Sequence, residues 1–168
     1  SVATGTLTIG DGRTGDITSG GDLQLGMVSQ LQLESAGNIT LNHALKGASS
    51  IAIGVDGNGT LTTGAGAAIQ ASSVALNGDK MDLAGSITGE RIDVNTHNST
   101  TGISLGAEQS GKLSLSSDEL NTLHASRVEI GTGSGYAGAL TVAGPVDLSG
   151  GNSASGQLNL GGASIAVN

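Results

Sequence analysis

The feature that most limits the fold of this chain is a short unit that recurs along its whole length. The unit is an apolar residue, any residue, a second apolar residue and then Gly, Asn or Ser, as at 7–10 (LTIG), 51–54 (IAIG) and 92–95 (IDVN). Alternation with a period of two predicts short strands that bury one face. Further strands of this kind are predicted at 23–25, 74–76, 103–105, 113–115, 128–130, 140–142, 146–148, 158–160 and 165–167.

Helical spacing is missing from the sequence. No window places apolar residues three and four apart over several turns, so we expect almost no helix. The segment 118–123 (DELNTL) comes nearest to that spacing, and we interpret it as a corner between strands.

The composition predicts a thin core. The chain has 168 residues, of which 30 are Gly, and it contains no Phe, Trp or Cys, one Tyr and one Pro. Aromatic side chains normally fill a wide core, whereas here Ile, Leu, Val and Ala must do so. A disordered chain would also be rich in Gly, Ser and Thr, but it would lack the regularly placed β-branched residues found here.

Many short strands fit either an antiparallel sandwich or a parallel solenoid. Strands of three residues would pair too weakly for a sandwich, whereas a solenoid stacks each strand on its copy in the next coil. The recurrence from Leu31 to Ile51, Val74, Ile92 and Leu113 predicts about three strands per coil. We therefore expect one all-β unit over residues 1–168, a parallel β-helix of seven to eight coils and a length of roughly 35 Å.

The two ends of the sequence repeat the interior pattern. Residues 1–4 (SVAT) and 164–168 (SIAVN) offer no charged or helical cap of the kind that protects solenoid ends. There is no recognisable signal peptide at Ser1. The chain is therefore expected to be a segment excised from a longer repeat shaft.

Residues 113–131 and 138–148 resemble the repeats of filamentous-haemagglutinin-like exoproteins. The most specific part is a Glu-Leu corner at 119–120 followed by a strand at 128–131 (VEIG). These exoproteins are large secreted adhesins of Gram-negative bacteria, exported by two-partner secretion, and similar repeats occur in autotransporter passengers. The resemblance implies a right-handed β-helix at the cell surface or in the medium, an outer-membrane transporter as export partner, and a role in adhesion, aggregation or biofilm formation.

Charge and hydropathy exclude two classes of partner. The net charge of −8 predicts no nucleic-acid partner, because phosphate binding needs a basic surface. No apolar run is long enough to span a membrane. The function expected is that of a structural shaft that supports cell adhesion. One alternative is a module that binds a cell-surface receptor or glycan through an outward face or through the loops 95–101 or 132–138, and another is a polysaccharide-degrading enzyme.

The candidate catalytic positions are acidic residues that lie between the apolar residues of a strand and so point outward. If two of them stacked on adjacent coils, their carboxylates would repel, raise a pKa or bind a cation. Outward positions are also simply polar, as at Gln24, Gln32, Ser104 and Ser114. Because aromatic and basic partners are scarce, we expect no enzyme and no cofactor. The acidic positions are Asp82, Asp93, Glu129 and Asp147.

Metal binding and glycosylation have weaker signals. The histidines His43, His97 and His124 lack the spacing of metal ligands, so no metal site is assigned. The acidic turns 11–16 and 56–59 leave calcium binding open. Three Asn-x-Ser/Thr sequons are possible glycosylation sites, although such short signals also arise by chance in a Thr-rich chain. They begin at Asn38, Asn58 and Asn98.

Overall fold

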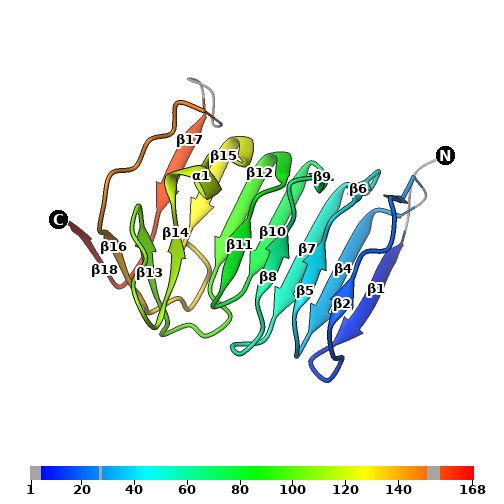
Figure 1. Cartoon of the computed structure of the whole chain (residues 1–168), viewed down its shortest axis with the longest axis horizontal. Helices are drawn as coiled ribbons and strands as arrows, with labels where there is room; N and C mark the ends of the chain where they lie inside the picture. Colours follow the sequence, from blue (N-terminus) through cyan, green and yellow to red (C-terminus); the bar gives the residue numbers. More distant parts are fainter. Residues whose placement is uncertain (1–4, 27, 151–155) are drawn as a thin grey trace.

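The computed structural model describes residues 5–26, 28–150 and 156–168, and these residues form short parallel strands almost throughout. Every strand pair within them is parallel. The strands stack side by side along the long axis, from β1 at one end to β17 and β18 at the other (Figure 1). The expectation about residues 1–4 lies outside the described part of the chain.

A 10-stranded sheet forms the largest part of the molecule and curls so that it makes two walls. Two of its strands, β12 (Ser86–Asn95) and β15 (Leu123–Ile130), are long enough to contribute to both walls. The first wall also contains β1 (Thr6–Asp11), β4 (Gln30–Ser35), β7 (Ser50–Val55), β10 (Ser73–Asn77) and β17 (Gln157–Leu160). The second wall also contains β3 (Leu23–Gln24), β6 (Ala44–Lys46) and β9 (Ala68–Gln70).

Two four-stranded sheets complete the architecture. One consists of β2 (Ile17–Thr18), β5 (Ile39–Leu41), β8 (Leu61–Thr63) and β11 (Met81–Leu83). The other consists of β14 (Lys112–Leu115), β13 (Gly102–Leu105), β16 (Ala139–Val142) and β18 (Ser164–Val167). The all-β class and short parallel strands predicted from the sequence are confirmed, and the curled parallel sheets are consistent with a β-solenoid.

The core is made of aliphatic side chains aligned in columns, because parallel strands in register place residues of the same kind above one another. We call one of these the central aliphatic column; each of its members is at most 1% exposed. Burial of such side chains is the main favourable term in folding. The column consists of Leu31, Ile51, Val74, Ile92 and Val128.

The predicted recurrence is confirmed from Leu31 to Ile92 and is wrong at the next step. Ile92 pairs with Val128, whereas Leu113 pairs with Ile103 in a different sheet. The reason is that the chain returns after β13 and lays β14 beside it. Gly106 and Gly111 make this return possible, because their φ angles of 83° and 76° suit glycine.

The same return buries two serines that alternation placed on the outer face. Ser104 is 0% exposed and Ser114 is 7% exposed. The segment 106–111 folds over them: the Ser104 hydroxyl donates to the carbonyl of Ala107 at 2.7 Å, and the N–H of Gln109 donates to the Ser114 hydroxyl at 3.0 Å. The outward assignment of these two positions is therefore wrong.

The predicted strand at 146–148 is also absent from the described structure, where this segment has no strand pairing. Pro145 has no N–H to donate, and the N–H of Asp147 donates instead to the Ser117 hydroxyl at 3.0 Å. Val146 and Leu148 still pack against the core.

The corner predicted at 118–123 contains one helical turn, α1 (Ser117–Leu120). A capping box between Ser116 and Glu119 starts this turn, and Leu120 is buried at 3% exposure. The described residues contain no helix long and apolar enough to span a membrane.

Candidate functional site

Two of the four predicted acidic positions come together on the outer face of the first wall. Asp93 in β12 and Glu129 in β15 are register partners, so the anticipated stacking of carboxylates occurs here. The Arg91 guanidinium lies between them, with one nitrogen, Nη2, 2.8 Å from Asp93 Oδ1 and 2.6 Å from Glu129 Oε2. Arg127 approaches Glu129 Oε1 at 3.6 Å. We call Arg91, Asp93, Arg127 and Glu129 the stacked charge cluster.

The two carboxylates have pKa values shifted in opposite directions. Desolvation by burial raises the pKa of Asp93, against the opposing effect of Arg91, and the neighbouring Glu129 raises it further. For Glu129 desolvation acts in the same upward direction, but its interaction with Asp93, the charge of Arg91 and hydrogen bonds from Asn159 and Thr132 outweigh it. The pKa of Glu129 is therefore lowered.

This arrangement makes a cross-strand ion-pair network. Both carboxylates already accept hydrogen bonds within the protein. Arg91 donates a hydrogen bond to each of them, and the Thr132 hydroxyl donates one to Glu129 Oε2 at 3.3 Å. The charges of Arg91 and Arg127 balance those of the two acids. The geometry therefore fits a role in stabilising the pairing of the adjacent strands β12 and β15. Oppositely charged side chains on neighbouring strands stabilise a sheet as ion pairs along one face stabilise a helix.

Asp82 and Asp147 lie in other surroundings. Asp82 is exposed on β11 and lines a shallow acidic groove with Glu108, Asp118 and Glu119. Glu119 has a structural role there, because its carboxylate accepts hydrogen bonds from the N–H groups of Ser116 and Leu83, at 2.9 and 3.2 Å. The described residues contain no group of three or more His, Cys, Asp or Glu that could hold a metal ion.

Asp147 closes a turn. Its carboxylate accepts a hydrogen bond from the N–H of Ser149 at 2.9 Å, and this bond lowers the pKa of Asp147. Its carbonyl accepts from the amide of Asn121 at 2.9 Å. The first bond closes the turn and the second attaches the segment after β16 to the end of α1, so Asp147 has a structural role.

Two of the predicted histidines each lie beside one aspartate, and one of these aspartates begins an acidic turn. His43 lies 3.9 Å from Asp22, and His97 lies 3.7 Å from Asp56. The carboxylate of Asp11 accepts from the N–H of Arg13 at 2.9 Å and from the Thr14 hydroxyl, and these bonds lower its pKa. Asp11 therefore closes its own turn.

The three sequon asparagines are all exposed. Asn38 is held between neighbouring turns: its Nδ2 donates to Asp16 at 3.2 Å and its Oδ1 accepts from the N–H of Thr60 at 3.0 Å. The Oδ1 of Asn98 accepts from both the N–H and the hydroxyl of Thr100. Glycosylation at Asn38, Asn58 and Asn98 stays a prediction.

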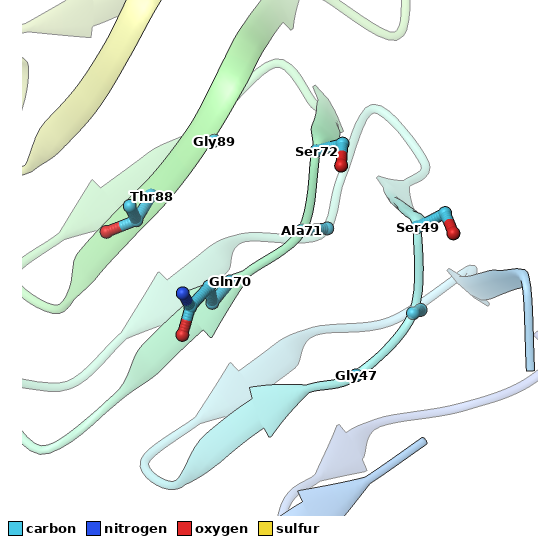
Figure 2. Close-up of a pocket in the computed structure, with 8 residues that line it drawn as sticks. Gly47, Ser49, Gln70, Ala71, Ser72, Thr88 and Gly89 are labelled. Atoms are coloured by element: carbon cyan, nitrogen blue, oxygen red, sulfur yellow. The ribbon is translucent and has the colours of Figure 1, made fainter. Parts of the chain in front are cut away.

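A shallow pocket of about 490 Å³ lies where successive turns meet along one corner. Figure 2 shows its residues arriving from stacked turns, with the hydroxyls of Ser49 and Ser72 pointing the same way. Its lining is small and uncharged, so it offers no acid, base or nucleophile activated by a neighbour. The lining residues are Gly47, Ala48, Ser49, Gln70, Ala71, Ser72, Thr88 and Gly89.

The sequence pattern placed the acids correctly on β12 and β15, but their arginine partners were missed. A usable signal was present, because 91–94 (RIDV) and 127–130 (RVEI) have the same order of basic, apolar, acidic and apolar residues. Two such strands in register bring charges of both signs together. No family model, curated protein or solved structure matches this chain.

Proposed function

We propose that this chain is a structural shaft segment of a large secreted bacterial adhesin. In this proposal it is a right-handed parallel β-helix with about three strands per coil and seven to eight coils. The observation that carries the proposal is the unbroken parallel register of the first wall. From β1 to β17 every strand pairs with the next, and the interior residues form continuous aliphatic columns.

The corners support the same function, because they too are linked from one turn to the next. The carbonyl of Ser29 accepts from the N–H groups of Ser49 and Ser50, both at 3.0 Å. The carbonyl of Ser72 accepts likewise from Glu90 and Arg91, at 2.9 and 3.1 Å. Hydrogen bonds in both strands and corners suit a rigid column that transmits force between its two ends.

The stacked charge cluster fits a shaft better than an enzyme. Its carboxylates are closed by arginines, so they are poorly placed to exchange protons with a substrate. We accordingly assign no catalytic activity. The shaft would act outside a Gram-negative cell, reach that location through an outer-membrane transporter partner, and support adhesion, aggregation or biofilm formation by holding other regions that bind a cell-surface receptor or glycan.

Deletion of one complete turn tests this proposal. Removing residues 50–72 joins Ser49 to Ser73 and takes out β7, β8 and β9 together, which leaves β4 to pair with β10. Each repeat of a solenoid contacts mainly its neighbours, so the shortened chain should fold. Displayed on bacteria between an outer-membrane anchor and a binding domain of known ligand, it should present that domain as well as the full chain does.

Two outcomes would contradict the proposal. One is loss of the β-strand signal in the far-ultraviolet circular dichroism spectrum when residues 50–72 are removed, because a stacked column should still fold without one of its turns. The other is cleavage of a polysaccharide by the purified full chain, with the cleavage abolished by Asp93→Asn or Glu129→Gln. Asp82→Asn is the matched control, since Asp82 is outside the stacked charge cluster.

A further inference from the structure

Two loops that are distant in the sequence meet beside the first wall. One follows β12 and spans residues 96–101, and the other follows β15 and spans residues 131–138. They start side by side because Val94 and Ile130, near the ends of these strands, are register partners. The N–H of Ala137 donates to the carbonyl of Ser99 at 2.8 Å, which joins the two loops.

The loops enclose a polar pocket of about 320 Å³, which we call the loop pocket. This volume is within the range of small-ligand sites, about 300–1,000 Å³. Its side chains come from two strands and from both loops. The residues that matter for the argument are Asn77, Asn95, His97, Ser99, Ser134 and Tyr136.

Tyr136 is the only aromatic residue of the chain, and the structure makes specific room for it. A Cβ atom at Gly131 would lie 3.0 Å from Cε1 of the ring, and one at Gly138 would lie 2.8 Å from Cε2. Larger residues at either position would therefore displace the ring. Its hydroxyl donates to the carbonyl of Thr101 at 3.0 Å, which ties one loop to the other.

Two asparagines provide the hydrogen-bonding side of the loop pocket. Asn77 and Asn95 are register partners on adjacent strands, so their backbones are about 4.8 Å apart, and both residues line the loop pocket. Oδ1 of Asn95 accepts from the N–H of Gly133 at 3.0 Å, which leaves its Nδ2 group for a ligand. The side chain of Asn77 is exposed and forms no hydrogen bond with any of the described residues.

The loop pocket carries little charge of its own. It contains no carboxylate, lysine or arginine, and its one titratable group besides Tyr136 is His97, which lies 3.7 Å from Asp56. The net charge of −8 repels anions from the molecule as a whole. A neutral ligand with several hydroxyl groups and an apolar face is the best match.

We propose that the loop pocket binds a neutral saccharide. Adjacent hydroxyls of one sugar ring pair with the amides of Asn77 and Asn95, because an amide both donates and accepts hydrogen bonds. The C–H face of the sugar packs against Tyr136, which combines an apolar ring with a polar hydroxyl. This is a lateral binding site, and it is independent of the shaft function.

A glycan array probed with the full chain tests the proposal, using neutral, sialylated and sulfated glycans. Asn77→Ala should weaken binding to the neutral glycans about tenfold, since it removes hydrogen bonds worth about 1.4 kcal/mol. Gln70→Ala is the matched control: it removes another exposed amide, at the pocket in Figure 2. Tyr136→Phe keeps the ring and should retain most of the binding, whereas Tyr136→Ala should abolish it.

Fold is monitored in each variant by circular dichroism, so that loss of binding is separated from loss of structure. Binding of neutral glycans that is reduced by Asn77→Ala and unchanged by Gln70→Ala supports the proposal. The proposal is overturned if the folded chain binds no neutral glycan on the array, or if it binds only sialylated or sulfated glycans. It is also overturned if the Asn77→Ala and Gln70→Ala variants bind neutral glycans equally well. None of these results changes the stacking of the strands, on which the shaft function depends.

Discussion

Replacement of Ile92 by alanine should destabilise the chain strongly, because Ile92 is in the middle of the central aliphatic column. It is 0% exposed and lies between Val74 and Val128 on the adjacent strands. The substitution removes three carbons, worth about 0.8 kcal/mol each on transfer from water. The narrow core cannot close the resulting cavity fully, so the total loss should be about 2–5 kcal/mol.

The free energy of unfolding is measured by urea denaturation followed by circular dichroism, with thermal melting as a second assay. A loss of this size should lower Tm by about 5–15 °C in a chain of this length. Thr88→Ala is the control, because Thr88 is exposed on the same strand, β12, and should change stability by at most about 0.5 kcal/mol. If Ile92→Ala were as stable as Thr88→Ala, the assignment of Ile92 to a packed column would be refuted.

Three further predictions concern β15 and its neighbour β12. Val128→Asp places an unpaired charge at a position that is 1% exposed, so it should cost about 3–5 kcal/mol; an unchanged thermal melt would contradict the inward orientation of Val128. Glu129→Gln should destabilise the chain at pH 7, and this cost should decrease as the pH is lowered into the range where Glu129 becomes protonated. The pKa of Glu129 is lowered by folding, so its contribution exists above the unfolded value of about 4.3 and is lost as the pH falls through the folded value. Asp93→Asn should cost less than Glu129→Gln at pH 7, because folding raises the pKa of Asp93 and disfavours its charge; the reverse order in urea denaturation would reject these directions.

Local alternation was sufficient to predict most strands, and for a physical reason. In a narrow core built from aliphatic residues, the period-two pattern of Leu31, Ile51, Val74 and Ile92 decides which side of each strand is buried. Parallel pairing then aligns these residues, which confirms the predicted recurrence from Leu31 to Ile92.

Local alternation failed where a loop changes the surroundings of a strand. Nothing near Ser104 indicates that residues 106–111 fold over its outer face and bury it. The residue that pairs with Ile92 is likewise decided by the insertion between β12 and β15, and the local recurrence gave no sign of this insertion. At 146–148 the pattern was right about burial and wrong about pairing, because Pro145 and the Ser117 hydroxyl change the hydrogen bonding.

The candidate site was predicted in part for the same reason. Alternation placed Asp93 and Glu129 outward, but only their register shows that they stack and share Arg91. The loops 95–101 and 132–138 were proposed as separate binding regions. Their meeting at Tyr136 depends on the pairing of β12 with β15, which involves residues too far apart for a local pattern to predict.

Distances between spin labels along the first wall test the stacked column most directly. Thr8, Ala75 and Asn159 occupy equivalent outward positions on β1, β10 and β17. The chain has no Cys, so labelled Cys pairs at these positions are unambiguous. At about 4.8 Å per strand, Thr8 and Ala75 should be about 14 Å apart and Thr8 and Asn159 about 29 Å apart at the backbone, each with a narrow distribution. Equal distances for the two pairs, or a broad distribution for the longer one, would contradict a column of stacked parallel strands.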